Sequence, residues 1–265
     1  MKKLSFLAIA FVAIAFAACG GQKSGQTEEA ADSLKSFEQQ QIEASIKMHL
    51  DSIAAEFGKM KQLPFVQDGV LSLTKEEKQV KPDYLFDAAI ADEATTLAEK
   101  YRILSALAVD KKIAELYEMP TEDYEKAINK LAADINDPSF KALEDTNTIF
   151  ETTTTLYDEM EKNGRINYFW QLAAAALVEQ LYDANQNVDK FITAFDDEAA
   201  ANVSFRIVLI LDAINRLSEY DADIEPVAKA LAPLDVLNAT TVSELKTQIA
   251  EAKEQIESAR KALVK

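Results

Sequence analysis

The stretch of sequence that decides the fold is VSFRIVLILDAINRL, which runs from Val203 to Leu217. Three of its residues, Leu209, Ile210 and Leu211, are consecutive and apolar, so they cannot all lie on one stripe of a helix. Because apolar residues fall on nearly every face of this segment, we expect a helix that at least two neighbours cover. The segment therefore predicts a central helix in an all-α domain.

Helical periodicity extends to both sides of this segment, with apolar residues three or four positions apart. The predicted helices cover residues 32–61, 83–118, 121–136, 138–163, 165–185 and 241–264, with a short one after residue 187. Gly164 supplies a left-handed stop, and the alanines of Ala173–Ala176 let a neighbouring backbone approach closely. The last helix carries many charged residues, Arg260 among them, and is expected on the surface. The pattern predicts an all-α bundle or stacked array of about eight helices.

Composition excludes several classes of site. Six glycines in 265 residues are too few for β-hairpin meanders or phosphate-binding loops. A single Cys excludes an internal disulfide and every multi-cysteine metal site, and a single His excludes a cluster of histidine ligands. Acidic residues outnumber basic ones by 45 to 28, so the net charge of −17 opposes binding to nucleic acid or to anionic lipid headgroups.

The N-terminus has the composition of an export signal. Two lysines at residues 2–3 precede the run Leu4–Ala18, which is apolar except for one serine. The run is shorter than the about 20 residues that span a membrane, and it has the length of the apolar region of a signal peptide. Two alanines end the run, and Cys19 follows them directly.

Small residues directly before a Cys resemble the lipobox of bacterial lipoproteins, a resemblance that covers only residues 1–21. It implies that residues 1–18 are removed and that Cys19 carries the lipid that anchors the protein to the membrane. Gly20 in place of Asp favours the outer membrane, by the sorting rule of enterobacterial lipoproteins. Residues 19–31 then form a lipidated flexible tether, and residues 32–265 a single all-α domain. An ordinary secretory signal followed by an unrelated Cys, or an uncleaved anchor, is the alternative interpretation.

One polar segment between two predicted helices carries oxygen side chains at alternate positions. These candidate calcium ligands are Asp183, Asn185, Asn187 and Asp189. The spacing resembles the first part of a helix–loop–helix calcium loop. However, Val188 stands where the sharp-turn Gly belongs, and Ala194 stands where the bidentate Glu belongs. The other interpretation is an Asn-rich turn that caps helices, and we predict no resident metal and no cofactor.

No catalytic constellation stands out in the sequence. His49 is the only imidazole, and a Gly-x-Ser-x-Gly elbow for a nucleophilic serine is missing. His49, at the edge of the apolar face of the first helix, is interpreted either as an axial haem ligand or as a packing or surface residue. Carboxylates are numerous, but no motif marks a pair of them, so the sequence does not identify a catalytic acid and base.

The sequence thus predicts a non-enzymatic envelope lipoprotein that presents a helical interaction or scaffold surface. Its partners would be the membrane, through the lipid on Cys19, and envelope proteins, but not nucleic acid. The alternative is a carrier with a pocket between helices for a small apolar ligand, and an enzyme ranks third. A pocket of several hundred Å³ lined by Phe and Trp would favour the carrier, whereas a large exposed apolar groove would favour the interaction protein.

Overall fold

The computed structural model describes residues 44–60, 71–143 and 153–264 of the chain. Backbone contacts place the described residues from Ile46 onward in one compact unit. The predicted leader, the tether and the domain boundary at residue 32 lie outside the described residues. Within the described ranges every regular element is a helix and no strand occurs, so the all-α prediction is confirmed. None of the described helices is long and apolar enough to cross a membrane.

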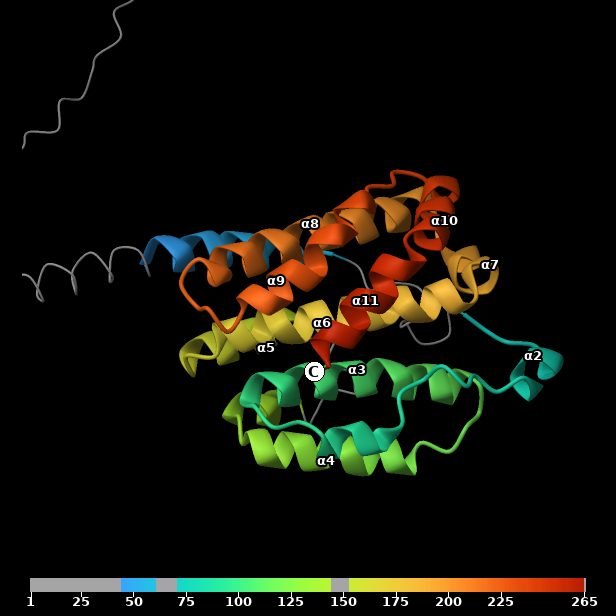
Figure 1. The fold of residues 1–265 in the computed structure, drawn as a ribbon, viewed down its shortest axis with the longest axis horizontal. Coiled ribbons are helices and arrows are strands. Elements are labelled where there is room, and N and C mark those ends of the chain that lie inside the picture. The colour runs from blue at the N-terminus through green and yellow to red at the C-terminus, as the bar shows by residue number, and fades with distance from the viewer. Residues whose placement is uncertain (1–43, 61–70, 144–152, 265) are drawn as a thin grey trace, which may run out of the picture. The chain divides into compact units, whose positions relative to one another are not determined.

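The elements follow one another along the chain as α-helices joined by short 3-10 helices (Figure 1). They are the helix of residues 44–57, α2 (Lys75–Gln79), η1 (Ala88–Asp92), α3 (Leu97–Leu116), α4 (Glu122–Ile135), η2 (Pro138–Leu143), α5 (Thr153–Lys162), α6 (Ile166–Gln186), α7 (Val188–Phe191), η3 (Ile192–Ala194), α8 (Asp197–Ser218), α9 (Glu225–Leu231), η4 (Ala232–Val236), α10 (Val242–Glu251) and α11 (Lys253–Leu263). Gly164, with φ of 67°, ends α5 in the left-handed conformation that the sequence predicts.

Helix α6 is the centre of the compact unit. It packs against α3, α5, α7, α8, α10 and α11, and Figure 1 shows it between the α3–α4 pair and α8. Its residues from Phe169 to Ala184 are buried, with Ala173 and Tyr182 partly exposed. Four of the buried side chains are polar, namely Gln171, Glu179, Gln180 and Asp183. A buried polar side chain is stable only where it forms hydrogen bonds, and a buried carboxylate only where it is paired with a cation or protonated.

Small side chains bring α3 and α6 close together. Ala174, Ala175 and Ala176 are buried on α6, and Ser105 is buried on α3. The Ser105 hydroxyl donates a hydrogen bond of 2.8 Å to the backbone carbonyl of Leu172. A serine side chain reaches a neighbouring helix backbone only at close approach, so α3 and α6 pack closely beside Leu172.

Helix α8 is not buried on nearly every face, which corrects the expectation from its composition. Val203, Ile207, Ile210 and Ile214 are buried at spacings of four and three residues, as on one face of an amphipathic helix. The opposite face is exposed and carries Phe205, described further below. The covering neighbours of α8 include α6, α9 and α10.

Three predicted helices are divided in the structure. The segment predicted over 83–118 consists of η1 and α3, because Thr96 caps α3: its hydroxyl accepts the Glu99 N–H, and the Glu99 carboxylate accepts the Thr96 N–H. The segment predicted over 138–163 contains η2 and α5, and the residues between them lie outside the description. The last predicted helix divides at Ala252 into α10 and α11.

The expected surface position of the last helix is wrong for one face of α11. Ile256, Ala259 and Leu263 are buried there, and α11 packs against α6 and α9. The side chain of Arg260 on this helix is only 11% exposed. Charged neighbours such as Lys261 stay exposed, so α11 is amphipathic with one cation directed inward.

Candidate functional site

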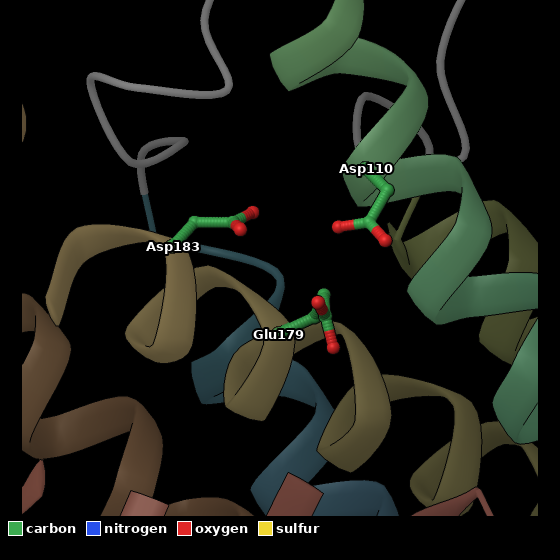
Figure 2. A group of neighbouring side chains, drawn as sticks. All are labelled: Asp110, Glu179 and Asp183. Carbon is green, nitrogen blue, oxygen red and sulfur yellow. The ribbon is translucent and has the colours of Figure 1, made fainter. Parts of the chain in front are cut away.

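Three carboxylates from two helices meet inside the unit. Asp110 comes from α3, whereas Glu179 and Asp183 lie four residues apart on α6 and therefore share one face of that helix. Their relative exposures are 0%, 1% and 0%. One oxygen from each side chain lies within 4.8 Å of the others, and Figure 2 shows the three side chains pointing toward one another. We call these three residues the acidic cluster.

Arg260 is the cation that faces the acidic cluster. Its Nε lies 2.9 Å from each carboxylate oxygen of Glu179, and one of its terminal nitrogens donates to Glu179 Oε1 at 2.6 Å. The same nitrogen is 3.9 Å from Asp110 Oδ2. The guanidinium carbon sits between two rings, 3.6 Å from the centroid of Phe86 and 3.8 Å from that of Tyr182. The bidentate ion pair with Glu179 and the cation–π contacts with the two rings fix the position of the Arg260 guanidinium.

The other two carboxylates are less well satisfied than Glu179. Asp110 Oδ2 accepts the backbone N–H of Phe86 at 2.7 Å. Asp110 Oδ1 and both oxygens of Asp183 accept no hydrogen bond from any residue that the structure describes. Because buried polar groups in native proteins are nearly always hydrogen-bonded, these three oxygens call for an explanation.

The environment opposes ionisation of the whole cluster. Burial raises the pKa of Asp110 well above its ordinary value, and the nearby carboxylates of Glu179 and Asp183 raise it further. Burial and the charge of Glu179 likewise raise the pKa of Asp183. Burial raises the pKa of Glu179 too, while its hydrogen bonds with Arg260 and the charge of that guanidinium oppose the rise. Three ionised carboxylates exceed the charge of one guanidinium by two, so protons or a further cation must reduce it.

The described residues close the cluster to solvent. Its three side chains are at most 1% exposed, and the rings of Phe86 and Tyr182 cover the guanidinium beside them. A general acid or base must come within hydrogen-bond reach of the proton it transfers.

The four candidate calcium ligands do not converge on one point. Asp183 belongs to the acidic cluster, on the last part of α6. The Asn185 side chain donates to the Ile249 carbonyl at 2.6 Å, and Asn187 caps α7 by accepting the Lys190 N–H. Asp189 forms an ion pair with Lys246. Asn187 thus acts as the helix cap that the alternative interpretation describes, and only Asp183 points into a polar cluster.

Of the remaining candidate residues, the structure places His49 at the surface and Trp170 in the core. His49 Nε2 lies 2.8 Å from Asp212 Oδ2, and the two side chains are 39% and 43% exposed, as expected for a polar contact at the edge of a helix. Trp170 is fully buried, and its ring meets those of Phe57, Tyr157 and Phe169 edge-on, so it belongs to the core. Cys19 lies outside the described residues.

Sequence reasoning missed Asp110, Glu179 and Arg260. Two carboxylates four residues apart, Glu179 and Asp183, are the acidic residues of a largely apolar segment, and this was the available signal. The charge of α11 concealed Arg260, because nothing in the pattern marks which of its charged residues turns inward.

A surface cavity of about 330 Å³ lies beside η1 and α4. Its lining consists of alanines and charged residues, among them Asp87, Asp92, Asp123 and Lys130. It contains no aromatic side chain, so it does not have the walls expected of a pocket for an apolar ligand.

Comparisons with protein-family models, with curated proteins and with solved structures find no match to this chain.

Proposed function

We propose that the chain is a lipid-anchored protein of the bacterial outer membrane whose helical domain acts without catalysis, by binding another envelope protein. The observation that carries the binding role is the outer face of α8. Phe205 and Val208 lie about one turn apart there and are 44% and 55% exposed. Scattered exposed apolar residues are ordinary, but two large ones side by side favour a surface that a partner covers.

The anchoring part of the proposal rests on the N-terminal sequence, where an apolar run ends in two alanines and Cys19. Mass spectrometry of the mature N-terminus should find Cys19 at the first position with its acyl chains. A Cys19→Ser variant should remain unprocessed and lose stable anchoring, since two or more acyl chains are needed for it. An intact Met1 or an unmodified Cys19 in the native protein would contradict the proposal.

The non-catalytic part is supported by the enclosure of the acidic cluster. This cluster has the most strongly perturbed carboxyl groups that the structure describes, and such groups often mark active sites. Here they face one another and Arg260 rather than an open cleft. The carrier hypothesis has less support, because the cavity beside η1 has charged walls.

The binding role can be tested by photo-crosslinking in intact cells. A photoreactive residue at position 208 should form a discrete adduct, and one at the exposed Lys126 of α4 should not. Adding Phe205→Asp should abolish the adduct while leaving the melting temperature unchanged. Equal adducts at both positions, or an adduct that survives Phe205→Asp, would contradict the role of this face.

A further inference from the structure

We propose that the acidic cluster is a structural binding site for a hard divalent cation such as Ca²⁺, Mg²⁺ or Mn²⁺, with Asp110, Glu179 and Asp183 as its protein ligands. This site is independent of the proposed binding role of α8. It sits between α3 and α6, the two helices that form the centre of the unit.

The unsatisfied carboxylate of Asp183 is the observation that indicates a bound ligand. It is fully buried, it is directed toward the other two carboxylates in Figure 2, and neither of its oxygens accepts a hydrogen bond from a described residue. Glu179 differs, because Arg260 satisfies it through both oxygens. A carboxylate placed in the core without any donor has no stabilising contact unless a proton or a cation supplies one.

The spacing and the type of ligand atoms agree with a cation. Ca²⁺ binds oxygen at 2.3–2.6 Å, so two ligands on opposite sides of one ion are roughly 5 Å apart. The cluster can present one oxygen from each residue with all separations within 4.8 Å. All three ligands are carboxylates, which suit Ca²⁺, Mg²⁺ and Mn²⁺ better than metals that prefer nitrogen or sulfur.

The charges also match. With the three carboxylates ionised and Arg260 protonated, the net charge of the group is −2, which one divalent cation neutralises. Among the described ion pairs, Arg260 joins Glu179 at 2.6 Å and Asp110 Oδ2 at 3.9 Å, and none joins it to Asp183. The guanidinium and the cation would therefore occupy different sides of Glu179.

Asp183→Asn separates the cation from the alternative of shared protons. The variant keeps the shape of the side chain, and Asp183 has no hydrogen bond from a described residue to lose. If a cation binds, the variant removes one ligand and one negative charge. If the cluster is neutralised by protons alone, a neutral amide at this position costs little. Asp158→Asn, on an exposed face of α5, is the matched control within a helix.

The experiment uses the full-length chain, purified in detergent, unfolded in guanidinium with EDTA and refolded in metal-free buffer. Ca²⁺, Mg²⁺ and Mn²⁺ are then added separately, and bound metal and melting temperature are measured. We expect one equivalent of one of these cations to bind and to raise the melting temperature by about 5 °C or more. Asp183→Asn should lose at least tenfold in affinity, and Asp158→Asn should behave like the parent chain.

Three results would overturn the proposal. The first is a melting temperature that none of the three cations changes, which would assign the cluster to shared protons. The second is an equal response in Asp183→Asn and the parent chain, which would place binding on the acidic surface. The third, should Asp183→Asn fail to fold, is the absence of bound metal in both the native parent chain and its refolded form.

Discussion

At Arg260 a single side chain combines three kinds of contact that are usually found apart. It forms a bidentate ion pair with Glu179, approaches Asp110, and stacks between the rings of Phe86 and Tyr182. Lysine could not replace it, because an ammonium has neither the planar fork nor the flat faces of a guanidinium. Arg260 is therefore the described cation that pairs with the buried Glu179.

Removing that cation should be among the most damaging substitutions in the chain. Arg260→Ala leaves the buried Glu179 without its partner, a situation that typically costs about 3–5 kcal/mol. For a chain of this length the melting temperature should fall by roughly 6–20 °C in calorimetry. Lys261→Ala, an exposed neighbour on α11, should cost no more than about 0.5 kcal/mol. A similar small loss for both variants would show that the ion pair is not needed.

At the scale of the element, composition does not predict which helix is central: α6, and not the more apolar stretch of α8, is the helix that the others cover. The apolar α8 has an exposed face, while α6 is covered by six elements although it contains Glu179, Gln180 and Asp183. A sequence pattern reports how apolar a helix is, but it does not report whether a polar residue will find a partner from another helix. The apolar pattern therefore overestimates the burial of α8 and underestimates that of α6.

Substitutions on the two faces of α8 should differ clearly. Ile210 is 2% exposed, so Ile210→Ala should cost about 2–5 kcal/mol, as other large-to-small changes in a core do. Val208→Ala removes a smaller, mostly exposed side chain and should change the free energy of unfolding by at most about 0.5 kcal/mol. Urea titrations of both variants measure these values. A silent Ile210→Ala would place the core on another face of the helix.

The start of α3 should make a contribution that depends on pH. The Glu99 carboxylate accepts N–H groups from Thr96 and Thr95, and these bonds lower its pKa from the ordinary 4.5. Because the folded pKa is the lower one, this stabilisation is complete at neutral pH and is lost as the pH falls through the folded value. The difference in unfolding free energy between the parent chain and Glu99→Gln should shrink from pH 7 to below pH 4. A difference that grows on acidification would contradict this sign.

The same cap gives a prediction at constant pH. Thr96→Ala removes the hydroxyl that accepts the Glu99 N–H and should cost about 1 kcal/mol in urea titrations at pH 7. Thr121→Ala is the control, since Thr121 precedes α4 without a side-chain cap hydrogen bond. Equal losses in the two variants would mean that the cap at Thr96 does not determine where α3 begins.

On the scale of the whole molecule, the helix of residues 44–57 belongs to the core. Leu50, Ile53 and Phe57 are each at most 7% exposed, and the Phe57 ring meets that of Trp170 at 5.9 Å. Burying side chains of this size contributes about 1.5–3 kcal/mol each. Together they contribute as much as the total stability of many domains.

Truncation should reveal this dependence. A chain that lacks residues 1–60 should lose cooperative unfolding, and the fluorescence of Trp170 should shift toward that of an exposed indole, because its cover is gone. A chain that lacks only residues 1–31 keeps the helix of residues 44–57 and should melt like the full-length chain. Equal melting temperatures for the two truncations would show that the helix of residues 44–57 is dispensable.

Much of the fold was predictable because it depends on local rules. Period, proline and glycine signals placed most helices, and Gly164 ended α5 as expected. The acidic cluster was not predictable, because it joins Asp110 to Glu179 across two helices and to Arg260 on a third. Such contacts are set by packing, and a single sequence carries no local mark of them. The surface position expected for α11 failed for the same reason.

The order of these residues along the chain has a consequence for synthesis. Arg260 follows Glu179 by 81 residues, so during N-to-C synthesis at about 5–20 residues per second the carboxylates emerge several seconds before the guanidinium. During that interval, if α3 and α6 close, they enclose Glu179 without the guanidinium that pairs with it in the complete fold. Nascent chains arrested before α11 should therefore hold this helix pair open, as a substrate for chaperones and proteases, and completion of the core should wait for α11.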